Sequence, residues 1–136
     1  MIPYKRYTDL VADITNNIHL IPHDIDGIIA IPRSGILPAS IISSILNLPI
    51  TTLDVFVHAD NLETAFFGKG FRNIKSNNFK KFIVIDDTTF NGTSLHNAYQ
   101  SLQNSNIVIK NNIQLLYYTV YLEKRHLYPY CPINIF

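Results

Sequence analysis

The sequence has little of what disulfide-bonded, zinc-binding or nucleic-acid-binding proteins need. Its single cysteine, Cys131, excludes an internal disulfide and fits a reducing compartment. The net charge of +1, with 15% charged residues, argues against a nucleic-acid partner, because such proteins carry a strongly basic face. The five histidines show no zinc-type spacing with acidic residues or with the cysteine. We therefore expect a cytoplasmic protein that does not bind nucleic acid.

Long hydrophobic runs are also missing. The most apolar stretch, residues 36–50, is interrupted by prolines and serines and falls short of the ~20 residues that cross a bilayer. Residues 1–13 mix charged with apolar side chains, unlike a signal peptide. We therefore expect no membrane span and interpret the apolar stretch as a buried helix. Without a repeat or a linker, residues 1–136 are predicted to form one domain.

The most informative stretch that is present is FKKFIVIDDTTFNGTSL, residues 79–95. The run from Phe82 to Ile85 is typical of a central parallel strand that is covered on both faces. Asp86 and Asp87 follow it, at the edge where open α/β sheets bind their ligands. Gly92 and its polar neighbours then precede a segment whose apolar residues have helical spacing. Free backbone N–H groups at such a helix start favour a phosphate.

Other sites can also end a strand in two aspartates. The magnesium strand of nucleotide hydrolases does so, and so does the acidic pocket of receiver domains. The phosphate-binding pattern GxxxxGK[ST] is absent, because residues 68–70 lack both its spacing and its final hydroxyl residue. A receiver domain has its acid pair after the first strand, whereas this pair lies in the second half of the chain.

A second motif, DGIIAIPRSGILPA at residues 26–39, joins an apolar strand to a charge-free helix through a tight turn. Arg33 offers a fork of donors that suits phosphate oxygens, and Gly35 lies at the start of the helix. Taken alone, the turn is also compatible with an ordinary strand-to-helix connection. Its position upstream of the acid pair favours the phosphate interpretation.

Together the two motifs resemble type I phosphoribosyltransferases, which bind phosphoribosyl pyrophosphate (PRPP) and release pyrophosphate. The resemblance implies that the acid pair contacts the ribose hydroxyls, that the turn after it binds the 5′-phosphate, and that the upstream loop, often with a strained peptide bond, binds pyrophosphate. It also implies Mg²⁺ as cofactor, held by Asp86 and Asp87 partly through water. The implied PRPP-binding residues are Arg33, Ser34, Gly35, Asp86, Asp87, Thr88, Thr89, Phe90, Asn91, Gly92, Thr93 and Ser94.

Residues 58–78 are predicted to be a loop, at the place where this family has a mobile segment. Lys69 and Arg72 are candidate catalytic residues that would neutralise charge on the leaving pyrophosphate. The alternative is that both cations only solvate a surface turn. Asp54 and Glu63 are the nearest acids that could orient or deprotonate an acceptor, and Asp54 is the one we select as catalytic.

The acceptor is suggested by a finer resemblance, to phosphoribosyltransferases of bacterial capsule and O-antigen clusters. It rests on IPRSGILPA, LNLPITTLDVF, GKGFR and IVIDDTTFNGTSL. It implies transfer to a glycan hydroxyl and a phosphatase as a possible partner. Phe90 stands where purine-salvage members carry an acid. A nucleobase enzyme of the orotate type and a non-catalytic PRPP-binding module remain alternatives, and a homodimer is possible.

Helices and strands alternate along the chain, which predicts an α/β fold: a single-domain, twisted, mostly parallel sheet flanked by helices. The family resemblance adds that the hood over the site is reduced. Predicted helices span Tyr4–Ile18 and Ile36–Leu46, with a third after the acid pair. Predicted strands span Gly27–Ile31, Ile50–Phe56, Phe82–Ile85 and Gln114–Leu122, and Asn104–Asn112 is predicted to be a polar connection.

Overall fold

Five parallel strands form the centre of the protein in a computed structural model that describes residues 6–66, 80–89, 93–122 and 133–135. The strand order is β2-β1-β3-β4-β5, and every pair of neighbours is parallel. The strands are β1 (Gly27–Ala30), β2 (Ile50–Thr52), β3 (Lys81–Thr89), β4 (Gln114–Leu122) and β5 (Ile133–Ile135). The predicted parallel α/β fold is confirmed, and β5 is a strand that the sequence did not predict.

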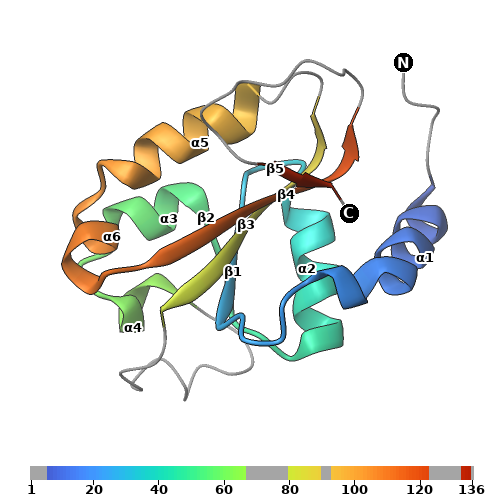
Figure 1. Ribbon diagram of the computed structural model, residues 1–136, viewed down its shortest axis with the longest axis horizontal. Helices are drawn as coiled ribbons and strands as arrows, with labels where there is room; N and C mark the ends of the chain where they lie inside the picture. Colours follow the sequence, from blue (N-terminus) through green and yellow to red (C-terminus); the bar gives the residue numbers. More distant parts are fainter. Residues whose placement is uncertain (1–5, 67–79, 90–92, 123–132, 136) are drawn as a thin grey trace.

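Helices cover both faces of this sheet (Figure 1). Alternate residues of β3 point to opposite faces, so Phe82 and Val84 belong to one apolar cluster while Ile83 and Ile85 belong to the other. The first cluster packs against α3 (Leu53–His58), α5 (Thr93–Gln103) and α6 (Asn106–Asn111). The second packs against α1 (Tyr7–Asn17) and α2 (Ile36–Leu46). Burial on both sides explains the unbroken apolar run of β3.

Strongly patterned segments have the predicted bounds. The helix α2 spans Ile36–Leu46 and β4 spans Gln114–Leu122, as expected. The first helix begins at Tyr7 and is followed by a short 3₁₀ helix at Ile18–Leu20. Within the described residues, no helix has both the length and the hydropathy to cross a membrane.

The prediction of a strand over Ile50–Phe56 was wrong in its second half. The strand β2 ends at Thr52, and α3 begins at Leu53. The ring of Phe56 is fully buried and makes edge contacts with Phe66 at 5.7 Å and with Phe82 at 6.0 Å between centroids. A helical turn directs this ring into the core, and that packing stabilises a helix too short to be stable alone.

Two predicted loops contain short helices. In the first, α4 (Leu62–Ala65) is capped by Asn61, whose side chain accepts a hydrogen bond from the Thr64 backbone N–H at 3.0 Å. In the second, the predicted polar connection is replaced by α6, which buries Ile107 against the core. Residues 67–79 of the first loop lie outside the described part of the chain.

Candidate functional site

The loop between β1 and α2 is fixed against the last buried residues of β3. The Ile31 N–H donates to the Ile85 carbonyl at 3.0 Å, and the Gly35 N–H donates to the Ile31 carbonyl at 2.8 Å. A Cβ on Gly35 would lie 2.4 Å from the Ile85 oxygen and 2.6 Å from the Ile31 oxygen. Only glycine lets the loop approach β3 so closely. The peptide bond between Pro32 and Arg33 is cis.

This loop and the acid pair meet through one side-chain hydrogen bond. The Ser34 Oγ donates to Asp86 Oδ1 at 2.9 Å, although the two residues are 52 positions apart in the sequence. The same carboxylate oxygen accepts the backbone N–H of Asp87, also at 2.9 Å. Arg33 directly precedes Ser34 in the sequence, and its side chain is exposed. The predicted pyrophosphate loop is therefore in contact with the first of the two predicted ribose acids.

Asp86 is a buried carboxylate, with an exposed fraction of 3%. Burial raises the pKa of Asp86 above its ordinary value, because desolvation disfavours the charged form. The hydrogen bonds from Ser34 and from the Asp87 N–H act in the opposite direction, and the neighbouring charge of Asp87 raises the pKa further. The described contacts therefore only partly offset the cost of a negative charge at this position.

The two acids do not project in the same direction. The predicted strand ended at Ile85, but β3 continues to Thr89 because its backbone goes on pairing with β4. Consecutive residues of a strand point to opposite faces. By this alternation Asp86 leaves the strand on the side of Val84, and Asp87 leaves it on the side of Ile85. The two acids thus lie inside the strand and point to opposite sides of it.

The predicted phosphate loop is only partly described. Thr88 and Thr89 are the last residues of β3, and Thr93 and Ser94 are the exposed first residues of α5. The expectation that a helix begins here is confirmed. Phe90, Asn91 and Gly92 lie outside the described residues.

The three predicted catalytic residues have different outcomes. Asp54 is exposed in the first turn of α3, after β2 and therefore at the same edge of the sheet as Asp86. A hydrogen bond with the Thr52 side chain is the main cause that lowers the pKa of Asp54, so this carboxylate is a weak base. Lys69 and Arg72 lie outside the described residues, and their roles stay predictions.

Glu63, the other acid considered, is not brought to the site. It lies in α4, next to Phe66, whose ring packs on Phe82 at 4.9 Å between centroids. Phe82 belongs to the first residues of β3, far along the strand from Asp86. Figure 1 shows α4 near that beginning of β3.

One polar residue beside the site was missed. Thr119 is fully buried in β4, directly opposite Asp86, and its hydroxyl donates to the Tyr121 carbonyl at 2.9 Å. The signal in the sequence was a threonine within the otherwise apolar and aromatic run of β4.

The comparison with family models identifies one domain. Residues 3–110 match the model described as "Phosphoribosyl transferase domain". A search of curated proteins finds no match.

Several solved structures share the fold. A hypothetical protein from Neisseria gonorrhoeae with bound ppGpp has a TM-score of 0.61 at 14% identity, over 97% of this chain and 80% of that one. The xanthine-guanine-hypoxanthine phosphoribosyltransferase of Helicobacter pylori has a TM-score of 0.53 at 13% identity, over 98% and 87%. The orotate phosphoribosyltransferase of Aeropyrum pernix has a TM-score of 0.53 at 13% identity, over 85% of this chain. This chain spans only 57% of the Aeropyrum enzyme.

Proposed function

Because the chain belongs to the phosphoribosyl transferase domain family, we propose that it transfers 5-phosphoribose from PRPP to an acceptor and releases pyrophosphate. The observation that carries this proposal is the hydrogen bond from Ser34 to Asp86. It joins the two segments that must bind one PRPP molecule, one at its pyrophosphate and the other at its ribose.

The proposed reaction is a displacement at C1 of the ribose. The acceptor atom forms a bond to C1 while the bond between C1 and the pyrophosphate oxygen breaks, and its electron pair leaves with pyrophosphate. The acceptor's proton passes to solvent or to a nearby base. Charge then grows on the leaving group, where the Arg33 guanidinium stabilises it. We propose that Lys69 and Arg72 add to this stabilisation.

Magnesium fits the donors of this site. Mg²⁺ prefers one or two carboxylates together with substrate phosphates and water, and it does not need a cage of protein ligands. Among the described residues, no group of three or more histidines, cysteines or acids could hold a metal. We propose that Asp86 and Asp87 hold the ion partly through water while PRPP supplies the remaining oxygens. When bound, the ion would neutralise charge on the pyrophosphate.

For the acceptor we favour a nucleobase. The similar structures from Helicobacter and Aeropyrum are named for transfer to purine bases and to orotate. The glycan hydroxyl, with a phosphatase as partner, depends on the sequence resemblance alone and stays a prediction. We place the reaction in the cytoplasm, because a chain with one cysteine fits a reducing compartment.

A non-catalytic module that binds PRPP is the second candidate function. The Neisseria protein supports it, because that protein shares this fold and was crystallised with a guanosine polyphosphate. In such a module the site would bind phosphorylated ribose without transferring it.

Pyrophosphate release from PRPP and Mg²⁺ separates these functions. The acceptors to compare are orotate, adenine, hypoxanthine, xanthine and guanine on one side and synthetic saccharides on the other. We expect release with a nucleobase. Release only with a saccharide would establish the glycan acceptor. Tight PRPP binding without release would establish the module, and failure to bind PRPP would refute both.

The acid pair gives a direct test of the site. We predict that Asp87→Asn weakens PRPP binding about tenfold or more, because it removes a charged partner of the ribose and of Mg²⁺. The measurement is calorimetric titration, with Asp24→Asn at the other end of the sheet as control. Unchanged affinity in Asp87→Asn, with a normal unfolding transition, would contradict the placement of the site.

A further inference from the structure

A tyrosine hydroxyl and a carboxylate join α1 to the end of β4, next to the acid pair. The Tyr121 hydroxyl donates a hydrogen bond to Asp13 Oδ2, across 108 positions of the sequence. In the register of β3 and β4, Tyr121 lies opposite Thr88, which is the residue that follows Asp87. The side chains of Tyr121 and Asp13 are both half-buried, so part of each is accessible.

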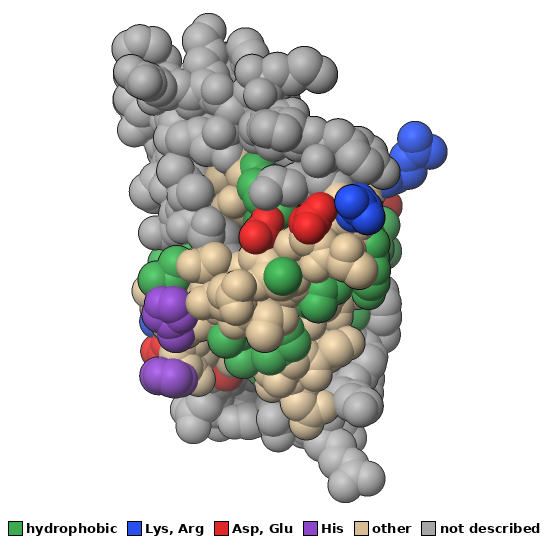
Figure 2. Space-filling view, turned by 90° about the vertical axis from the view of Figure 1, so that its right-hand side faces the viewer, with side chains coloured by type: hydrophobic (Ala, Val, Ile, Leu, Met, Phe, Trp, Pro, Cys, Tyr) green, Lys and Arg blue, Asp and Glu red, His purple; other side chains and the backbone are tan. Residues whose placement is uncertain are grey.

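Asp87 belongs to the same surroundings. Its side chain points to the α1 side of β3, and its charge is one of the causes that raise the pKa of Tyr121. Burial is the largest cause, and the hydrogen bond with Asp13 and the charges of Asp13 and Asp9 also contribute. The hydroxyl therefore remains protonated at neutral pH and donates to the carboxylate. In Figure 2, which shows the side of the molecule that carries α1, acidic side chains lie close to a basic one.

The strand order places this pair opposite the pyrophosphate loop. That loop follows β1, the acid pair lies on β3, and Tyr121 ends β4 on the other side of β3 (Figure 1). In a displacement, the attacking atom and the leaving group are on opposite sides of the reacting carbon. If PRPP has its ribose over β3 and its pyrophosphate toward β1, its acceptor approaches C1 from the side of β4.

We propose that Tyr121 and Asp13 form one wall of the acceptor pocket and orient a nucleobase opposite the leaving pyrophosphate. This inference rests on the proposed transferase function. The chemistry of the pair suits a planar heterocycle, because the carboxylate of Asp13 accepts ring N–H groups and the phenol ring offers an apolar surface for packing. Both residues are positioning residues in this proposal, and neither takes part in bond making.

A purely structural role makes a different prediction. Tyr118, also on β4, has a hydroxyl that donates to the Leu20 carbonyl at 3.3 Å, so it too ties the N-terminal segment to the sheet. It lies three residues before Tyr121, and its side chain is buried in the cluster beneath α1 and α2. Tyr118→Phe is therefore a matched control that removes a comparable tie away from the acid pair.

The experiment measures what the base adds to binding. Calorimetry with Mg²⁺ gives the Kd of ribose 5-phosphate and the Kd of orotidine, inosine, guanosine and adenosine 5′-monophosphates for each variant. The Kd of ribose 5-phosphate divided by the Kd of a nucleotide gives the contribution of the base to affinity, because the ribose and phosphate are common to both ligands. We expect Tyr121→Phe and Asp13→Asn to lower the best ratio about fivefold, as for one ordinary hydrogen bond. Ribose 5-phosphate binding should stay within about twofold, and Tyr118→Phe should change neither constant.

Three results would overturn the inference. The first is a ratio unchanged in Tyr121→Phe and Asp13→Asn. The second is an equal loss of ratio in Tyr118→Phe, which would make the pair a structural tie. The third is a wild-type protein that binds ribose 5-phosphate but gains nothing from any base. A wild-type protein that does not bind ribose 5-phosphate would instead refute the proposed function itself.

Discussion

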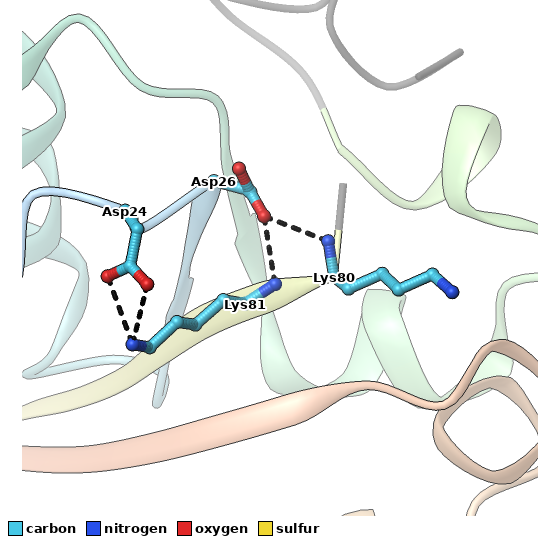
Figure 3. A network of polar contacts seen from close by, with 4 residues as sticks. All are labelled: Asp24, Asp26, Lys80 and Lys81. Carbon is cyan, nitrogen blue, oxygen red and sulfur yellow. Dashed lines mark hydrogen bonds and ion pairs between the residues drawn. The ribbon is translucent and has the colours of Figure 1, made fainter. Parts of the chain in front are cut away.

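Aspartates lie at both ends of β3, but their charges are stabilised to different extents. At the amino end, one Asp26 carboxylate oxygen accepts the backbone N–H groups of Lys80 and Lys81, at 2.8 and 2.9 Å. Asp24 forms an ion pair with the Lys81 ammonium at 2.9 Å (Figure 3). At the carboxyl end, Asp86 is buried and accepts hydrogen bonds from the Ser34 hydroxyl and the Asp87 N–H.

The pKa shifts of these acids have opposite signs. The hydrogen bond from Lys81 is the main cause that lowers the pKa of Asp24, whereas burial raises the pKa of Asp86. The amino end thus stabilises its charges within the protein. The carboxyl end keeps a charge that the fold does not fully stabilise, as expected where a ligand complex supplies the positive charge.

A cavity of about 700 Å³ lies at the amino end, and its lining includes Asp24, Asp26 and both lysines. These acids already have partners in the chain, so we assign no ligand to it. The chemistry of the residues, not the volume, separates a binding site from a structural clamp.

The largest effect is expected for Gly35→Ala in the loop after β1, compared with Gly27→Ala at the start of β1. Gly35→Ala would place a Cβ within 2.6 Å of two backbone oxygens, which cannot move without displacing β3. We expect a loss of about 3 kcal/mol in the free energy of unfolding, and loss of PRPP binding. Gly27→Ala, at the amino end, meets a Phe66 ring carbon at 2.8 Å. Because a side chain can shift, it should lose less stability and still bind PRPP.

Urea unfolding and calorimetry measure both glycine variants. A Gly35→Ala protein with normal stability and normal affinity would show that the close approach of loop and strand is not required.

The next comparison sets a variant that should lose stability against a variant that should lose PRPP affinity. Asp26→Ala leaves two backbone N–H groups without their acceptor, so we expect a loss of about 1 to 2 kcal/mol in unfolding free energy and unchanged PRPP affinity. Asp86→Asn keeps an oxygen for Ser34 and removes the poorly solvated charge. We expect equal or greater stability and about tenfold or more weaker PRPP binding. The same two measurements apply, and a similar profile for both variants would abolish the contrast between the ends.

The difference in stability between the wild type and Asp86→Asn should depend on pH with a definite sign. Because the pKa of Asp86 is raised in the folded state, its charge lowers stability at neutral pH, and protonation relieves that cost as the pH falls through the raised pKa. The stability advantage of Asp86→Asn should therefore be present at about pH 8 and shrink as the pH falls toward the ordinary aspartate pKa of about 4. Urea unfolding of both proteins at the two pH values tests this. An advantage that grows on acidification would contradict burial as the cause.

The smallest effect is expected for the exposed ion pair. Asp24→Asn removes the partner of Lys81, but Asp24 is exposed and solvent screens the pair. We expect no resolvable change in the melting temperature at physiological salt. A clear destabilisation, lost again in high salt, would show that the amino end depends on this pair more than its exposure suggests.

Local sequence pattern predicted the elements that are long and uniformly apolar. The run before the acids, the charge-free α2 and the β-rich β4 are all in place. The short elements α3, α4 and α6 escaped, because helices of four to six residues depend on packing such as that of Phe56 and Ile107. The strand β5 escaped because it has only three residues and forms through its pairing with β4.

The sequence by itself determined which chemical groups the site contains: the two adjacent acids, the Arg33 loop and a helix start after the acids. Only the tertiary structure decided how they face one another. Pairing with β4 carries β3 to Thr89 and so turns Asp86 and Asp87 to opposite faces. Packing of α1 brings Asp13 to Tyr121. Such contacts join residues far apart in the chain, and no local pattern encodes them.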